Sequence, residues 1–171
     1  MNQTQRKTFY ICSRLLVYPN SSLLSSLDEL KKEAESLPEQ LAVQLLDFID
    51  HLADMDQIEL QESYVKTFDF SENCSLYLSY PSLGVSMERG SELLKLKNLY
   101  RKSGMVDNGK ELPDYLPTFL RFLSIAGDED AELALRSYST QITELANNVE
   151  RVNSLYSKLF RVLVGAMGGE A

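Results

Sequence analysis

Apolar residues recur at steps of three and four along most of the chain, the spacing of an amphipathic α-helix. In residues 8–18, for example, Phe9, Cys12 and Leu15 share one face. Pro38 separates two such stretches, because proline disfavours helix in the preceding residue but suits the first turn of a new one. The pattern predicts helices over residues 8–18, 22–37, 38–55, 57–68, 86–103, 114–127 and 135–163.

Polar residues and glycines mark the expected helix ends. Ser22 or Ser26 is placed to cap the second helix, and Asp114 to cap the sixth. Gly104 supplies a left-handed stop after the fifth. The last helix is expected to be continuous, with a kink allowed at 147–148.

Residues 75–85 do not fit the helical pattern. They alternate between apolar and polar types, and Pro81 and Gly84 interrupt them. Because nothing else in the chain offers a strand to pair with, we expect a helical turn or an extended connection here, not an edge strand. The chain is therefore expected to be all-α, a single-domain bundle of about seven to eight helices over residues 1–165, with a loose tail at 166–171.

Charge is unevenly distributed. The 171 residues carry a formal net charge of −8, and residues 26–72 hold 13 acids against 3 bases. Such a surface repels phosphate backbones and attracts cations, so the chain is not expected to bind nucleic acid, and a basic peptide fits better. The alternative is a solvated helix face that only keeps the protein soluble.

Membrane and redox signals are weak. No apolar run approaches the roughly 20 residues that cross a bilayer, and the N-terminus is amphipathic, so we expect a cytoplasmic protein that does not insert into membranes. Cys12 and Cys74 form no Cys-x-x-Cys pair. They are expected to be buried thiols, with no metal site and no disulfide.

Catalytic patterns are missing from the sequence. His51, the one histidine, has acids beside it but no second histidine or nearby cysteine. Residues 104–110 have the glycine and lysine spacing of a phosphate-binding loop, but a helix precedes them and Glu111 occupies the hydroxyl position. We interpret them as a helix stop followed by a turn at 107–109, and expect no enzyme activity.

Two stretches are more particular. The first motif, residues 64–78, contains YVKTFDF and SLYL, and the second motif, residues 111–123, contains ELPDYLP and FLRFL. With the Glu-Arg-Gly at 88–90 and the helix at 94–100 between them, they resemble the NarJ family over residues 8–165. TorD and DmsD chaperones are similar.

That resemblance implies an all-helical cytoplasmic chaperone, a monomer, that binds the N-terminal segment of the apo nitrate reductase alpha subunit. It would keep this client competent for molybdenum cofactor insertion and membrane assembly. The client carries molybdopterin guanine dinucleotide, and the chaperone holds no cofactor stably. Alternatives are a chaperone for another molybdoenzyme of the TorD and DmsD client class, a generic helical adaptor, or a cofactor-handling enzyme.

The candidate peptide-binding residues combine large apolar side chains with charges near two irregular connections. Asp69, Glu111 and Asp114 are placed to meet client arginines through charge-assisted hydrogen bonds, whereas Arg89 is placed to pair with one of these acids and set the loop. Each has a structural alternative, such as a helix cap for Asp114 or a core position for Tyr64. The full set is Tyr64, Phe68, Asp69, Leu76, Tyr80, Arg89, Glu111, Leu112, Pro113, Asp114, Tyr115 and Phe119.

Two departures from the resemblance stand out. In TorD-like relatives the second motif has a histidine where this chain has Tyr115, so no role of an imidazole carries over. Many NarJ proteins also have a longer C-terminal tail than this sequence.

Overall fold

The computed structural model describes residues 1–71, 73–106 and 109–168. Within them the chain forms ten helices, of which α2 and α6 are single turns or little more. The helices are α1 (Gln3–Leu15), α2 (Ser21–Ser25), α3 (Leu27–Glu35), α4 (Glu39–Asp54), α5 (Gln57–Phe68), α6 (Tyr80–Leu83), α7 (Met87–Lys102), α8 (Leu116–Ile125), α9 (Asp128–Arg151) and α10 (Ser157–Ala166). The expected all-helical fold is confirmed; about seven to eight helices were expected, and eight of the ten described ones are longer than α2 and α6.

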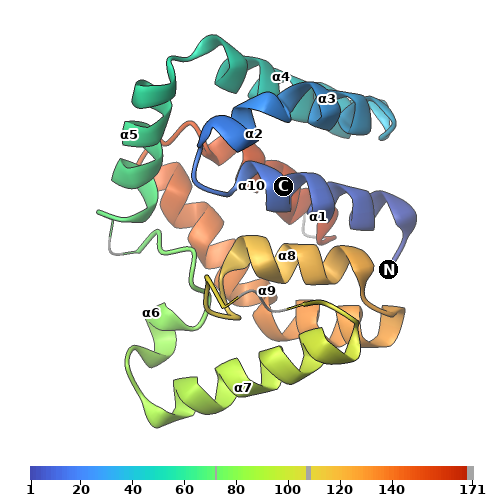
Figure 1. Cartoon of the computed structure of the whole chain (residues 1–171), viewed down its shortest axis with the longest axis vertical. Helices are drawn as coiled ribbons and strands as arrows, with labels where there is room; N and C mark the ends of the chain where they lie inside the picture. Colours follow the sequence, from blue (N-terminus) through green and yellow to red (C-terminus); the bar gives the residue numbers. More distant parts are fainter. Residues whose placement is uncertain (72, 107–108, 169–171) are drawn as a thin grey trace.

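Helix α1 occupies the centre of the bundle. It packs against α8, α10 and α3; α10 lies behind it and α9 passes behind α8 (Figure 1). Its side chains Phe9, Ile11, Cys12 and Leu15 are completely buried. At the other extreme, α7 forms an outer edge of the molecule, and of its side chains only Leu96 and Tyr100 are buried.

Helix α1 begins at Gln3, five residues before the predicted start. The side chain of Asn2 accepts a hydrogen bond from the Gln5 backbone N–H at 2.8 Å, and the Gln5 side chain accepts one from the Asn2 N–H at 3.0 Å. This reciprocal capping box satisfies two backbone donors that a helix start otherwise leaves unpaired. The apolar periodicity begins later than the cap, so it underestimated the helix.

The second predicted helix is divided into α2 and α3. The side chain of Asn20 caps α2 by accepting from the Leu23 N–H at 3.1 Å, so the prediction of a Ser22 cap is wrong. Ser26 precedes α3 without capping it, because its hydroxyl donates to the Leu23 carbonyl instead.

The last predicted helix, 135–163, is also two helices. Helix α9 begins at Asp128, where three acids in its first turn match the positive end of the helix dipole. It ends at Arg151, and Asn153 takes a left-handed conformation with φ 51° before α10 begins. Asparagine tolerates that conformation better than most residues, so the break lies there and not at 147–148.

One predicted helix end is confirmed, while one face assignment and the predicted start of the tail are wrong. Gly104, with φ 75°, ends the helix α7 region as predicted. Met87 was assigned to the buried face of α7 but is exposed. The predicted turn at 107–109 includes Asp107 and Asn108, which lie outside the described residues, as do residues 169–171 of the predicted tail; Ala166, assigned to that tail, ends α10.

Both cysteines are buried free thiols, as expected. Burial raises the pKa of the Cys12 thiol to about 12, so this side chain remains a neutral apolar group. In the described part of the chain, no helix combines the length and apolar character needed to span a bilayer.

Candidate functional site

The two motifs meet in space. Tyr77 and Tyr115 form an isolated antiparallel bridge, in which the Leu78 N–H donates to the Asp114 carbonyl at 2.9 Å and the Leu116 N–H donates to the Leu76 carbonyl at 2.8 Å. The expectation that residues 75–85 would find no pairing partner is therefore wrong. Its partner is the second motif, which carries no strand signal.

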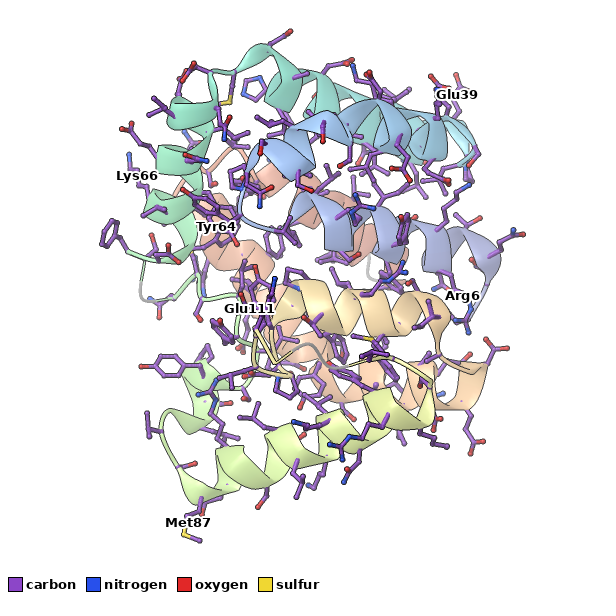
Figure 2. The ribbon with its side chains drawn as sticks, viewed as in Figure 1. Arg6, Glu39, Tyr64, Lys66, Met87 and Glu111 are labelled. Atoms are coloured by element: carbon purple, nitrogen blue, oxygen red, sulfur yellow. The ribbon has the colours of Figure 1, made fainter. Side chains whose placement is uncertain are left out.

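A groove of about 560 Å³ opens beside this bridge, between the end of α5, the 75–80 segment and the loop before α8. Figure 2 shows Tyr64 and Glu111 on this side of the molecule. We call it the aromatic groove. It is lined by Tyr18, Tyr64, Phe68, Asp69, Ser71, Ser75, Leu76, Tyr77, Tyr80, Glu111 and Tyr115.

The floor of the aromatic groove is a packed set of rings. Tyr64 and Phe68 lie one turn apart on α5 and are only 5% exposed each, with ring centroids 4.9 Å apart and edge to face. Tyr18 packs edge to face against Tyr64 at 5.5 Å. Because such contacts hold rings in fixed orientations, the floor is a rigid apolar surface.

Two phenols connect this floor to the bundle. The Tyr64 hydroxyl donates to the Leu16 carbonyl at 3.2 Å. The Tyr115 hydroxyl oxygen lies 3.1 Å from the Tyr64 hydroxyl oxygen. Since the single proton of Tyr64 is used on Leu16, Tyr115 is the donor in the second bond. Burial raises the pKa of both phenols, so both stay protonated.

The rim of the aromatic groove carries acidic side chains that are exposed to solvent. Asp69 and Glu111 are exposed, and Glu111 accepts a 2.6 Å hydrogen bond from the Tyr77 hydroxyl. Tyr80 is 47% exposed and presents its ring at the edge of the groove. Of the 12 acids in residues 26–72 that the structure describes, Asp69 is the one that lines the groove, so the rim does not come from the acidic stretch as a whole.

Asp114 is not a helix cap. Tyr115 occupies the cap position of α8, and the Asp114 carboxylate is completely buried. Its Oδ2 accepts hydrogen bonds from the Ser79 N–H at 3.2 Å, from the Ser79 hydroxyl at 2.5 Å and from the Arg89 guanidinium at 3.1 Å. Asp114 is therefore not part of the exposed surface of the groove.

Arg89 pairs with an acid, Asp114, as expected from the sequence. It reaches from α7 to Asp114, donates to the Ser79 hydroxyl at 3.1 Å and lies over the Tyr80 ring at 5.3 Å. It thus fastens the start of α7 and one wall of the aromatic groove to the bundle.

The remaining candidates lie outside the groove. Phe119 is completely buried against Tyr138 and Phe122 and belongs to the core. The Pro113 carbonyl accepts a 2.6 Å hydrogen bond from Tyr100, and Leu112 is exposed elsewhere. Seven of the twelve candidates, namely Tyr64, Phe68, Asp69, Leu76, Tyr80, Glu111 and Tyr115, line one groove.

The sequence interpretation missed Tyr18, Ser71, Ser75 and Tyr77 as lining residues. Tyr77 lies inside the first motif and was available from it. Tyr18 comes after the end of α1, and no local pattern connects it with residues some fifty positions later, which the fold brings beside it.

No metal-binding cluster accompanies the groove in the part of the chain that the structure describes. No group of three or more His, Cys, Asp or Glu side chains is placed to hold a metal there, and His51 is exposed. What the groove offers is a surface for binding, with an apolar floor and an anionic rim.

Comparison with known proteins decides the family. The family model described as the nitrate reductase delta subunit matches residues 31–161. This chain belongs to the nitrate reductase delta subunit family. The match includes every lining residue of the aromatic groove except Tyr18, and it confirms the NarJ-type resemblance.

The chain is also similar to curated assembly chaperones. The chain is 38% identical to the probable nitrate reductase molybdenum cofactor assembly chaperone NarJ of Bacillus subtilis, over 98% of this chain and 92% of that protein. It is 31% identical to NarJ of Escherichia coli K12 over 90% of this chain, which corresponds to 66% of that longer protein. Part of the nitrate reductase-like protein NarX of Mycobacterium tuberculosis is also 31% identical, over 79% of this chain.

Proposed function

We propose that this chain is a nitrate reductase assembly chaperone that binds the N-terminal segment of the apo alpha subunit in the aromatic groove. Binding would keep the subunit competent for insertion of its molybdenum cofactor and for membrane assembly. The observation that carries the proposal is the pairing of a rigid aromatic floor with two exposed carboxylates, in a family whose named relatives are cofactor assembly chaperones.

The floor suits one apolar face of a short amphipathic segment. Rings that are already ordered lose little conformational entropy on binding, and they bring large apolar areas into contact. Tyr18 and Tyr80 keep enough exposed surface, 43% and 47%, to contact a ligand without any unfolding of the core. A segment laid over them would cover Tyr64 and Phe68 as well.

The rim selects for positive charge. Asp69 and Glu111 line the groove from two different loops, so a cationic segment is attracted along its length. Rim charges of this kind act mainly on association rate and salt dependence, while the buried rings determine how long a complex lasts.

The proposed role requires no chemistry from this chain. Molybdopterin guanine dinucleotide belongs to the client, and the chaperone acts as a cytoplasmic monomer that leaves before the enzyme is complete. Its contribution is to occupy an apolar, basic segment until the cofactor is in place.

Calorimetry tests the proposal with the purified chain and a synthetic peptide of the alpha subunit's N-terminus. Tyr18→Ala and Tyr80→Ala should each weaken binding about tenfold, as interface aromatics commonly do. Leu133→Ala, an exposed apolar residue on α9 outside the groove, is the matched control and should bind like the original chain. Equal affinity for all three variants would refute the groove as the binding site.

A second comparison isolates the rim. Asp69→Asn combined with Glu111→Gln should weaken binding at low salt and reduce its salt dependence. Glu59→Gln combined with Glu129→Gln removes the same charge from exposed positions outside the groove. If both pairs change affinity alike, net charge and not the rim is responsible.

A further inference from the structure

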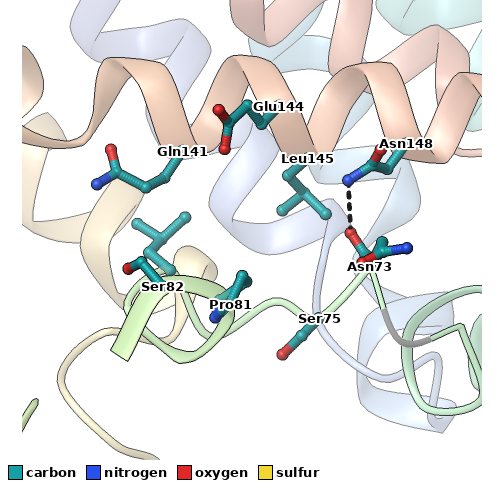
Figure 3. A pocket seen from close by; sticks show the side chains of 9 residues that line it. Asn73, Ser75, Pro81, Ser82, Gln141, Glu144, Leu145 and Asn148 are labelled. Carbon is teal, nitrogen blue, oxygen red and sulfur yellow. Dashed lines mark hydrogen bonds between the residues drawn. The ribbon is translucent and has the colours of Figure 1, made fainter. Parts of the chain in front are cut away.

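A second cavity lies on the other side of the 73–82 segment, between that segment and α9 (Figure 3). Its volume is about 200 Å³, and Ser75 lines both this cavity and the aromatic groove. We call it the α6–α9 pocket. Its lining residues are Asn73, Ser75, Leu78, Pro81, Ser82, Gln141, Glu144, Leu145 and Asn148.

One part of the α6–α9 pocket is apolar. Leu78 and Leu145 are buried side chains that contribute to its lining, and the Pro81 ring faces α9 from the opposite side. Such walls fit the methylene stem of a long side chain, which gains from burial while its polar end stays free to bond.

The polar part offers acceptors without partners. The Gln141 Oε1 atom is buried and has no hydrogen-bond partner, and Glu144, one turn further along α9, makes no ion pair with any described residue. Buried polar atoms are nearly always hydrogen-bonded, so an unpaired one beside a cavity marks a place where a donor fits.

Three of the other polar lining residues make hydrogen bonds within the chain. The Asn148 amide donates to the Asn73 carbonyl at 2.9 Å, the interaction drawn in Figure 3. The Ser82 hydroxyl donates to the Ser79 carbonyl at 3.4 Å, and the Ser75 hydroxyl oxygen accepts from the Tyr77 N–H at 3.3 Å. Together with the unpaired Gln141 Oε1 atom, the exposed Glu144 carboxylate gives this part of the pocket an acceptor and a negative charge.

We infer that the α6–α9 pocket binds an arginine side chain of the client whose apolar face lies in the aromatic groove. The stem would pack between Leu78, Pro81 and Leu145, and the guanidinium would donate to Gln141 Oε1 and to the Glu144 carboxylate. A planar group with several donors meets two neighbouring acceptors better than an ammonium does. The inference rests on the proposed function, since the peptide in the groove delivers the side chain past Ser75.

The test replaces each arginine of the synthetic alpha-subunit peptide in turn by citrulline, which keeps the shape and removes the charge. One replacement should weaken binding to the original chain about tenfold, the effect of a charge-assisted hydrogen bond at a partly exposed site. Glu144→Gln should weaken binding of the arginine peptide by a similar factor. In this variant the arginine and citrulline peptides should bind with equal affinity. A lysine at the same position should bind with intermediate affinity.

Gln141→Leu adds a readout that a purely structural role would not give. Removing a buried acceptor without a partner should leave the free energy of unfolding unchanged or higher, while affinity for the arginine peptide falls and affinity for the citrulline peptide does not. Glu129→Gln on the same helix is the control for loss of charge, and it should leave the arginine preference intact.

The outcomes separate the two proposals. If the original chain binds no peptide, the proposed function fails and this inference fails with it. If Tyr18→Ala weakens binding but no citrulline replacement matters, or if the arginine preference survives in Glu144→Gln, the groove stands and the arginine pocket is refuted.

Discussion

Replacing Arg89 by alanine is expected to destabilise the chain by about 3–5 kcal/mol, the usual result of removing one partner of a buried ion pair. The guanidinium lies 3.1 Å from the Asp114 carboxylate, which is completely buried, and the arginine side chain itself is only 12% exposed. The substitution would leave a negative charge inside the protein with the two Ser79 donors as its remaining partners.

The contacts support that magnitude. Two unit charges 3.1 Å apart attract by about 5 kcal/mol at an effective dielectric constant of about 20. The other carboxylate oxygen of Asp114, Oδ1, is buried and has no hydrogen-bond partner. It therefore provides no interaction that could compensate for the lost attraction to Arg89. Adding Asp114→Asn should therefore restore about 2 kcal/mol, since it removes the charge that costs most to bury.

Urea unfolding followed by circular dichroism measures both effects. Lys158→Ala is the matched control, because Lys158 pairs with Asp47 at 2.5 Å but both side chains are at least half exposed. The control should lose less than about 1 kcal/mol. The account is contradicted if Arg89→Ala lowers the free energy of unfolding no more than Lys158→Ala does. It is also contradicted if the double variant with Asp114→Asn is less stable than Arg89→Ala alone.

Three further predictions concern the core, α7 and the cysteines. Phe119→Ala should destabilise the fold by about 3–5 kcal/mol in urea, and peptide affinity of the molecules that remain folded should be unchanged; a specific loss of affinity would return Phe119 to the binding site. The Glu92 carboxylate accepts a 2.7 Å hydrogen bond from Tyr138, which lowers its pKa from 4.5. Tyr138→Phe should therefore lose about 1 kcal/mol at pH 7, and that loss should shrink as the pH falls below 4.5; a constant loss would be inconsistent with the bond. Cys12 and Cys74 should resist iodoacetamide until the chain unfolds, and mass spectrometry showing rapid alkylation of the native protein would contradict their burial.

Much of the helical architecture could be predicted from the local spacing of apolar residues. The three- and four-residue repeats give most of the helices, and Pro38 and Gly104 mark two of their limits, whereas the polar caps predicted at Ser22 and Asp114 were wrong. The first motif also gave Tyr64 and Phe68 as neighbours on α5, because residues four apart share a helix face.

Long-range pairing is what the sequence did not reveal. Asp114 looked like a helix cap because capping depends on local order, whereas its true partners, Ser79 and Arg89, are 35 and 25 residues away. Tyr18 was missed as a groove residue for the same reason, because its ring contact, Tyr64, is distant in the sequence. The break at Asn153 was hidden because the apolar repeat continues across it, and only the packing of α10 against α1 and α4 requires the chain to turn there.

Site-specific photo-crosslinking gives the most direct test of the central claim, that the aromatic groove holds the client. A benzoylphenylalanine placed at Tyr77 or Tyr80 should crosslink to the alpha-subunit peptide, and mass spectrometry should map the product to the peptide's apolar, basic segment. The same probe at Leu133, exposed on α9 outside the groove, should give no product. Crosslinking at Leu133 equal to that at the groove positions, or none at the groove while the peptide is bound, would contradict the account.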